Sequence, residues 1–192
     1  MVFDRYAHLS PLVGPGAALL FVAMWVSAVL LDGGWVLWEN TLSDLGVSEN
    51  GVSRALFNSA CVISGVYLSV FSVFMINVDG GWKGRTWIFS AVGGLFLLLV
   101  GVFTKDEIDV HTAVAVTFGA LCAFGMILHL IFDLYERDLV KSALLLVLTA
   151  VVIVSLIPGK IAVSEPVMVV CLLAWVAYTG LDVYVNRNKS GL

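Results

Sequence analysis

Six long apolar runs follow one another along this chain, and they restrict its fold more than any other feature. A helix needs about 20 mostly apolar residues to cross the hydrocarbon of a bilayer. The runs cover residues 11–31, 54–76, 86–103, 109–132, 139–157 and 166–185. They are continuous, whereas the strands of outer-membrane barrels alternate in polarity over about 10 residues. The pattern predicts an all-α integral membrane protein, a six-transmembrane-helix bundle in which residues 1–192 form a single membrane domain.

The composition excludes most soluble classes of protein. Hydrophobic residues make up 60% of the chain and charged residues 12%, whereas about 25% of the residues in soluble domains are charged. The net charge of −4 leaves no basic patch for nucleic acid. The first run is longer than the apolar part of a signal peptide, so we expect it to be retained as a helix. We expect free core thiols and no disulfide framework from Cys61, Cys122 and Cys171, which lie far apart within apolar runs.

Lysine and arginine are distributed unequally between the two ends of the expected bundle, because six spans put both termini on one side. Seven basic residues fall on that side: Arg5, Lys83, Arg85, Arg137, Lys141, Arg187 and Lys189. Three fall on the other: Arg54, Lys105 and Lys160. Positive residues favour the cytoplasm, so both termini are expected to be cytoplasmic in a multi-pass protein of the cell membrane. The loops that then face outward are 32–53, 104–108 and 158–165.

Small residues gather in the second, third and fourth spans. Lipid gives no hydrophobic drive between helices, so close approach depends on residues such as glycine. Gly65 lies in the second span, Gly93 and Gly94 in the third, and Gly125 in the fourth. We expect these spans to form the tight centre of the bundle and the fifth span to face lipid over much of its surface.

The longest connection between spans is expected to pack on the membrane surface. It covers residues 32–53 and contains Trp35 and Trp38. Because tryptophan favours the boundary between lipid and water, both are interpreted as interfacial anchors.

Two short polar stretches interrupt the apolar pattern on the expected outer face. Residues 39–46 read ENTLSDLG, and residues 104–111 read TKDEIDVH. Polar groups are costly to bury without partners, so we expect the stretches to meet at the outer rim. A ring nitrogen of His111 is expected to bond to Asp109 or Asp44. The predicted outer pocket consists of Asn40, Ser43, Asp44, Asn58, Asp106, Asp109 and His111.

Several interpretations of this pocket stay open. Its groups can be helix caps and loop clamps around a hydrated funnel, or they can bind a lipid headgroup, an ion or a substrate. No metal is predicted, because one histidine among carboxylates lacks the usual ligands of zinc and the spacing of a calcium loop. Catalysis is less favoured than binding because no G-x-S-x-G or H-E-x-x-H motif occurs. No cofactor is predicted.

Polar residues near the expected cytoplasmic end are interpreted more simply. His129 follows His111 by 18 residues, which is about 27 Å along a helix, so the two lie near opposite membrane surfaces. We expect His129 to be an interfacial polar tip; a haem would require it to pair with His8 instead. A solvated turn is expected from Asp133, Glu136, Arg137 and Asp138.

Two sequence elements resemble a known family. The first is N-x-x-S-D-L-G at residues 40–46, with Phe57-Asn58 in the second span, and the second is G-x-F at residues 101–103, with acids and His111 after it. Together they resemble an uncharacterised six-helix prokaryotic membrane family, domain of unknown function 998, over nearly the whole chain. That family is distantly similar to the eukaryotic Frag1/DRAM/Sfk1 group, which is associated with lipid anchors and lipid asymmetry. The resemblance implies a lipid-related role and marks Ser43, Asp44, Asn58, Asp109 and His111 as positions to test.

The favoured function is the binding or organising of lipid headgroups at the outer pocket, or the support of a membrane-protein partner. Membrane lipids are the expected partners, and a homo-oligomer is a further option. The alternative is a membrane enzyme for a lipid or isoprenoid substrate, with His111 as base and Asp109 or Asp44 orienting it. A small transporter ranks third, because the available polar groups along the midplane are uncharged.

Overall fold

A computed structural model of the chain describes residues 7–190. Arg5, which entered the charge count, lies outside the described residues, as do the side chains of His8 and Lys189. Six of the described helices are long and apolar enough to cross a membrane. This confirms the predicted six-helix integral membrane fold, and the described range contains no strand. The direction in which the bundle crosses the membrane stays a prediction.

The elements follow the predicted order, with three short 3₁₀ segments between or before the long helices. The long helices are α2 (Val13–Asp32), α3 (Gly51–Asp79), α4 (Gly81–Val102), α5 (Ile108–Tyr135), α6 (Leu139–Leu156) and α7 (Ile161–Ser190). The 3₁₀ segments are η1 (Ala7–Leu12), η2 (Leu42–Val47) and η3 (Lys105–Glu107).

Several helices begin before the apolar run that predicts them, because local capping and turn chemistry decide where a helix starts. Asn50 caps α3, and its side-chain oxygen accepts hydrogen bonds from the backbone N–H groups of Val52 and Ser53. Between α3 and α4, Gly80 and Gly81 have φ angles of 61° and 51°. Glycine adopts this left-handed region without a steric cost, so α4 can start at once and carry its first charged residues inside the helix.

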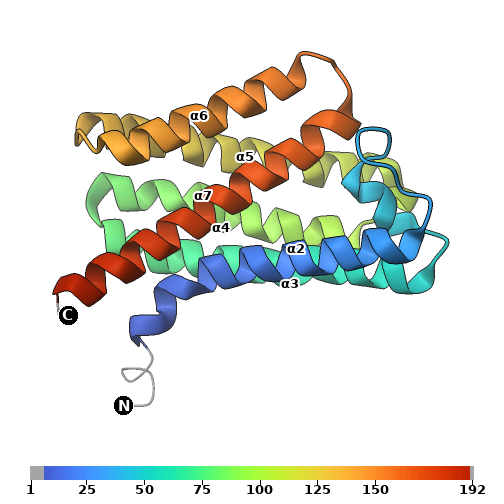
Figure 1. The fold of residues 1–192 in the computed structure, drawn as a ribbon, viewed down its shortest axis with the longest axis horizontal. Helices are drawn as coiled ribbons and strands as arrows, with labels where there is room; N and C mark the ends of the chain where they lie inside the picture. Colours follow the sequence, from blue (N-terminus) through green and yellow to red (C-terminus); the bar gives the residue numbers. More distant parts are fainter. Residues whose placement is uncertain (1–6, 191–192) are drawn as a thin grey trace.

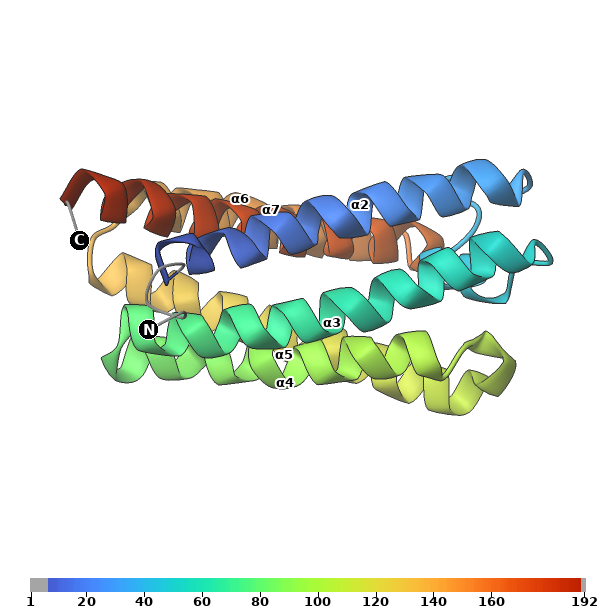
Figure 2. The ribbon, with the colours of Figure 1, turned by 90° about the horizontal axis from the view of Figure 1, so that it is seen from below.

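The helices form two layers of three. Figures 1 and 2 show α3, α4 and α5 in one layer and α2, α6 and α7 in the other, with α7 crossing diagonally between its two neighbours. Helix α2 begins and α7 ends at the same end of the bundle, which is called the termini end here. The opposite end carries η2 and is called the η2 end.

Glycines hold α3 and α4 close together. A Cβ atom on Gly65 would lie 2.5 Å from the carbonyl oxygen of Gly94, and one on Gly94 would lie 2.6 Å from that of Gly65. The Ser69 hydroxyl donates a hydrogen bond to the Ala91 carbonyl at 2.8 Å. On the other side of α4, a Cβ atom on Gly93 would meet the Cys122 sulfur of α5 at 2.8 Å. The prediction of a tight centre made by the second to fourth spans is confirmed.

The long connection between α2 and α3 packs into the bundle and does not lie flat on its surface. Leu42 and Leu45 of η2 are 1% and 0% exposed. The Trp35 indole N–H donates to the Thr41 carbonyl at 2.7 Å, and its ring packs edge-on against Trp25. Trp35 therefore fastens the loop, because its N–H finds a partner inside the protein.

The thiols behave as the sequence predicts. Cys61, Cys122 and Cys171 are free and buried. Each lies in a different helix, so the core uses them as small apolar side chains.

Candidate functional site

At the η2 end, a carboxylate from α7 holds the polar loop. Glu165 accepts a hydrogen bond from the backbone N–H of Leu42 at 3.0 Å and another from the Ser43 hydroxyl at 2.7 Å. Glu165 lies five residues into α7, where the sequence places it next to Pro166. Glu165 falls in the connection 158–165, which is predicted to face outward, but the predicted outer pocket left it out because it is far in sequence from the two polar stretches.

A second carboxylate closes the loop on itself. Asp44 accepts from the backbone N–H of Thr41 at 2.7 Å, and Lys105 of η3 lies 2.6 Å from both Asp44 Oδ1 and Thr41 Oγ1. Partial burial raises the pKa of Asp44, but the hydrogen bonds from Lys105 and Thr41 outweigh it, so this pKa lies below its usual value. The sequence marked Asp44 correctly as a polar contact point but not its partner Lys105.

Asn58, one of the predicted pocket residues, ties η2 to α3. Its side-chain amide donates to the Gly46 carbonyl at 3.0 Å. A Cβ atom on Gly46 would lie 2.7 Å from Asn58 Oδ1, so any larger residue there would displace the Asn58 amide. We call this group of contacts the η2 clamp; its side chains are Ser43, Asp44, Asn58, Lys105 and Glu165.

The remaining residues of the predicted outer pocket have local roles. His111 is 5% exposed, and its Nδ1 lies 2.7 Å from the Phe103 carbonyl. Phe103 is the C-cap residue of α4, and carbonyls at a helix end lack partners within the helix. Its carbonyl therefore accepts a hydrogen bond from the His111 ring. The expected His111 contact with Asp109 or Asp44 is therefore wrong. Asp109 lies exposed in the first turn of α5.

Two further predicted residues stabilise turns. Asn40 accepts a hydrogen bond from the Val36 N–H at 2.9 Å, and Asp106 accepts one from the Thr104 hydroxyl at 3.0 Å. Each of these contacts spans four residues or fewer, so neither residue reaches the η2 clamp through them.

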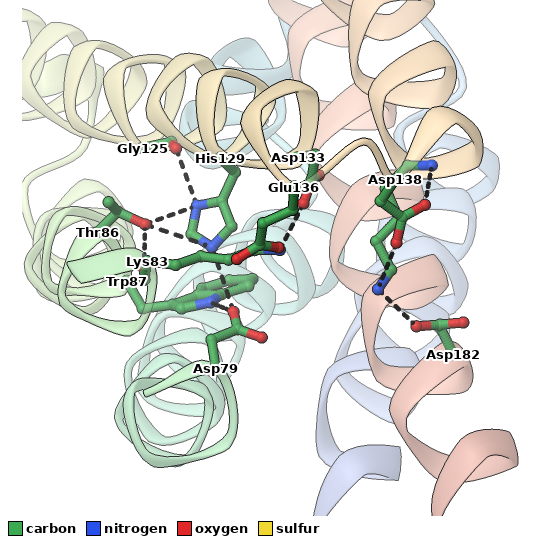
Figure 3. Close-up of polar contacts among 11 residues, drawn as sticks. Asp79, Lys83, Thr86, Trp87, Gly125, His129, Asp133, Glu136, Asp138 and Asp182 are labelled. Atoms are coloured by element: carbon green, nitrogen blue, oxygen red, sulfur yellow. Dashed lines mark hydrogen bonds and ion pairs between the residues drawn. The ribbon is translucent and has the colours of Figure 1, made fainter. Parts of the chain in front are cut away.

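The richest collection of charged groups lies at the termini end, where the sequence predicted a solvated turn (Figure 3). Lys83 of α4 forms ion pairs with Asp133 of α5 at 2.6 Å and with Glu136, the C-cap residue of α5, at 2.5 Å. Asp133 is only 3% exposed. Asp133 follows His129 by one helical turn, so α5 points both residues toward the same neighbours.

The largest correction to the sequence prediction concerns the position of His129. It is 3% exposed and is not an interfacial tip. Its Nδ1 lies 2.9 Å from the Thr86 hydroxyl and 3.1 Å from the Gly125 carbonyl, and its Nε2 lies 3.5 Å from Asp79 Oδ2. Asp79 also accepts the indole N–H of Trp87 at 2.6 Å. The sequence signal was the i, i+4 spacing of His129 and Asp133 on one helix.

A second ion-pair group joins α6 to α7 beside the first. Lys141 lies 3.1 Å from Asp138 and 3.1 Å from Asp182. Asp138 also caps α6 by accepting the Lys141 N–H at 3.2 Å. Slight burial raises the pKa of Asp138, but these bonds outweigh it and hold the pKa below its usual value.

We call these groups together the charged cluster: Asp79, Lys83, His129, Asp133, Glu136, Asp138, Lys141 and Asp182. All of these residues except Glu136 and Asp138 line a cavity of about 30 Å³. The cluster holds five carboxylates and two lysines, so ionised carboxylates outnumber lysines by three. Within residues 7–190, no three His, Cys, Asp or Glu side chains converge as a metal ion would need.

A stacked pair of tryptophans packs against this site through Trp175, which lines the cavity. Trp87 and Trp175 stack with ring centroids 4.8 Å apart, and the His129 ring packs edge-on against both. A second cavity of about 40 Å³ lies nearer the middle of the bundle, next to residues 169–176 of α7. Its lining is apolar apart from the Ser64 hydroxyl, which has no hydrogen-bond partner among the described residues.

The described residues define an integral membrane protein with six spanning helices, an apolar cavity and a charged cluster at one end. A family model described as "Protein of unknown function (DUF998)" matches residues 15–182, and the chain belongs to this family. Comparisons with curated proteins and with solved structures found no match. The likeness to the Frag1/DRAM/Sfk1 group therefore stays a prediction.

Proposed function

We propose that this protein binds an amphiphile of the membrane inside its bundle, with the chain in the apolar cavity and the polar head toward the charged cluster. The supporting observation is the order of the two cavities along α7. Val169, Leu172 and Val176 line the apolar cavity, whereas Tyr178 and Asp182 line the charged one. An amphiphile presents the same order of polarity along its length.

The apolar cavity suits a hydrocarbon chain because small residues of α2 open it. Gly14, Ala17 and Ala18 contribute almost no side-chain volume to its wall, and Phe21 closes one end. A buried hydroxyl without a partner costs free energy, about 1–3 kcal/mol for a polar group of this size. Ser64 is in this position, and a ligand that carries an oxygen acceptor would relieve the cost.

The charged cavity suits a head group that carries positive charge or donates hydrogen bonds. Asp79, Asp133 and Asp182 all reach its lining, together with Lys83 and Lys141. Each lysine is already held between two carboxylates. Carboxylate oxygens are therefore the groups available in excess to a ligand.

The supply of polar groups that are free to meet a ligand argues against the η2 end as the binding site. There, the polar groups of the clamp satisfy one another, and Ser43 donates its hydroxyl to Glu165. A histidine-activated serine at this end is not supported, because the His111 ring bonds to a backbone carbonyl. The η2 clamp instead supports a role in fixing the long loop.

The test is to fill the apolar cavity and to measure the lipid that co-purifies. Ala18, which is 7% exposed, is replaced by phenylalanine, and the bound mass is determined by native mass spectrometry and lipid extraction. A matched control is Val154→Phe on α6, where the side chain is 61% exposed. We expect Ala18→Phe to remove the bound lipid and Val154→Phe to retain it, with monodisperse protein in both cases. Equal lipid content in the two variants would overturn the proposal.

A second experiment tests whether the charged cluster binds the head group of the lipid. Asp182→Asn removes one carboxylate of the charged cluster while leaving the apolar cavity intact. We expect the mass spectrum of co-purified lipid to lose species with amine-bearing head groups relative to the wild type. An unchanged lipid profile in Asp182→Asn, together with loss in Ala18→Phe, would keep the chain site and reject the head site.

A further inference from the structure

We infer that Asp79 and His129 form a proton-binding site at the termini end, in which one proton is held between the imidazole Nε2 and the carboxylate. This inference does not depend on the ligand proposed above. It follows from the number of donors and acceptors around the ring.

The first ring nitrogen must carry hydrogen. The Gly125 carbonyl, 3.1 Å from Nδ1, can only accept a hydrogen bond. The Thr86 hydroxyl, 2.9 Å from Nδ1, already donates its own hydrogen to the Lys83 carbonyl at 2.7 Å. Both neighbours of Nδ1 are therefore acceptors, so the hydrogen lies on Nδ1.

The second ring nitrogen then needs a proton nearby. In a neutral ring with hydrogen on Nδ1, Nε2 is a bare lone pair. This lone pair would face Asp79 Oδ2 at 3.5 Å and the Thr86 hydroxyl oxygen at 3.4 Å. Because the Thr86 hydrogen points to the Lys83 carbonyl, both oxygens act as acceptors and repel a bare Nε2. A proton on the ring or on the carboxyl removes the repulsion. The Trp87 N–H donates to the same Asp79 oxygen at 2.6 Å. This bond fixes the position of the carboxyl group beside Nε2.

The surrounding charges favour the bound proton. The charged and titratable groups around the pair are Lys83 on α4, Asp133 on α5, Glu136 and Asp138 in the turn between α5 and α6, Lys141 on α6, and Tyr178 and Asp182 on α7. With Asp79 itself included, five carboxylates and two lysines give a formal charge of −5 + 2 = −3 beside a neutral His129 ring, and one added proton makes it −2. An excess of nearby negative charge stabilises a protonated group.

The pair can exchange its proton with water from one end of the bundle. Asp79 and His129 both line the cavity of about 30 Å³, and a cavity needs only about 10–15 Å³ of probe-occupied volume to hold a water molecule. The Asp79 side chain is 19% exposed, whereas that of His129 is 4% exposed. Asp79 is thus the contact with water, and His129 is the buried partner.

The experiment reads the two protonation states directly. The protein, labelled with ¹⁵N-histidine and studied in nanodiscs near pH 7, gives nitrogen shifts that separate bare from protonated ring nitrogens. His129→Gln identifies the signals of His129 among those of the three histidines. In parallel, infrared difference spectra with Asp79→Asn report whether the Asp79 carboxyl is protonated.

We expect either a doubly protonated His129 ring or a protonated Asp79 carboxyl in the wild type. In Asp79→Asn, the amide can donate to Nε2, so the ring should become neutral with hydrogen on Nδ1 alone. The control Asp109→Asn, an exposed carboxylate at the other end of the same helix as His129, should leave the signals unchanged. A neutral ring beside an ionised Asp79 in the wild type, or hydrogen on Nε2 alone, would overturn the inference. Since the wild-type spectra decide between these outcomes, the test stands even where a variant fails to fold.

Discussion

Trp87 of α4 and Trp175 of α7 stack face to face, with ring planes inclined by 6° and centroids 4.8 Å apart. They are 0% and 2% exposed. Each belongs to a different layer of the bundle, so this contact joins the layers between the charged and the apolar cavity.

Replacing Trp175 with alanine is expected to destabilise the protein and to join the two cavities. Loss of a buried tryptophan costs about 3–5 kcal/mol, since the neighbours collapse only partly into the space. The measurement is unfolding in detergent, followed by circular dichroism. Trp82→Ala is the matched control, because Trp82 is 72% exposed and its loss should change stability by about 0.5 kcal/mol or less. Equal effects of the two variants would contradict this role for the stack.

Removing Lys83 is expected to be more harmful than removing both partners of its buried ion pair. Lys83→Met leaves Asp133 with a buried charge, and such a change typically costs about 3–5 kcal/mol. The double variant Lys83→Met/Asp133→Asn removes that charge as well and should recover part of the loss. Unfolding free energies of the wild type, both single variants and the double variant give the coupling. Additive losses would show that the two side chains act independently.

Gly94→Ala is expected to push α3 and α4 apart. The added methyl group would lie 2.6 Å from the Gly65 carbonyl oxygen and 2.8 Å from the Ser69 nitrogen, and backbone atoms cannot give way as side chains do. Overpacking of this kind costs about 1–3 kcal/mol. Gly16→Ala in α2 is the control, since nothing lies within 4 Å of its added Cβ; there, alanine should be neutral or stabilising. Thermal unfolding of the two variants checks the difference.

The η2 clamp is expected to weaken in acid. The pKa of Asp44 lies below its usual value of 3.8 in the folded protein, so the ionised carboxylate contributes stability above about pH 4. This contribution is lost as the pH falls through the lowered folded pKa. Asp44→Asn should therefore be less stable than the wild type at pH 7, and the two should converge toward pH 3. A stability difference that does not change with pH would contradict the Asp44–Lys105 contact.

The helical architecture is predictable from the sequence because the bilayer requires it. Apolar runs of sufficient length leave the backbone no alternative to helices, and the glycines of the second and third spans already indicate where helices approach. Helix starts are less predictable, because Asn50 and Gly80 act through local geometry that hydropathy does not register.

The side-chain partners could not be predicted in the same way. His111 follows three acids and a lysine in sequence, yet its ring turns to the carbonyl of Phe103 at the end of α4. His129 is surrounded in sequence by apolar residues, and its partners Asp79 and Thr86 come from other helices. The pattern of residue types marks where polar groups occur, but the packing of α3 against α4 and α5 decides which of them meet.

Helix α7 touches the polar groups at both ends of the bundle, through Glu165 at the η2 clamp and Asp182 at the charged cluster. These residues are 17 positions apart, which is about 25 Å along a continuous helix. Figure 1 shows α7 running across the bundle as one continuous helix, so a change in its tilt moves both of its ends. An event on one side of the membrane that releases Lys141 from Asp182 would therefore also shift the anchor of the long loop on the other side, with α7 acting as a lever across the bilayer.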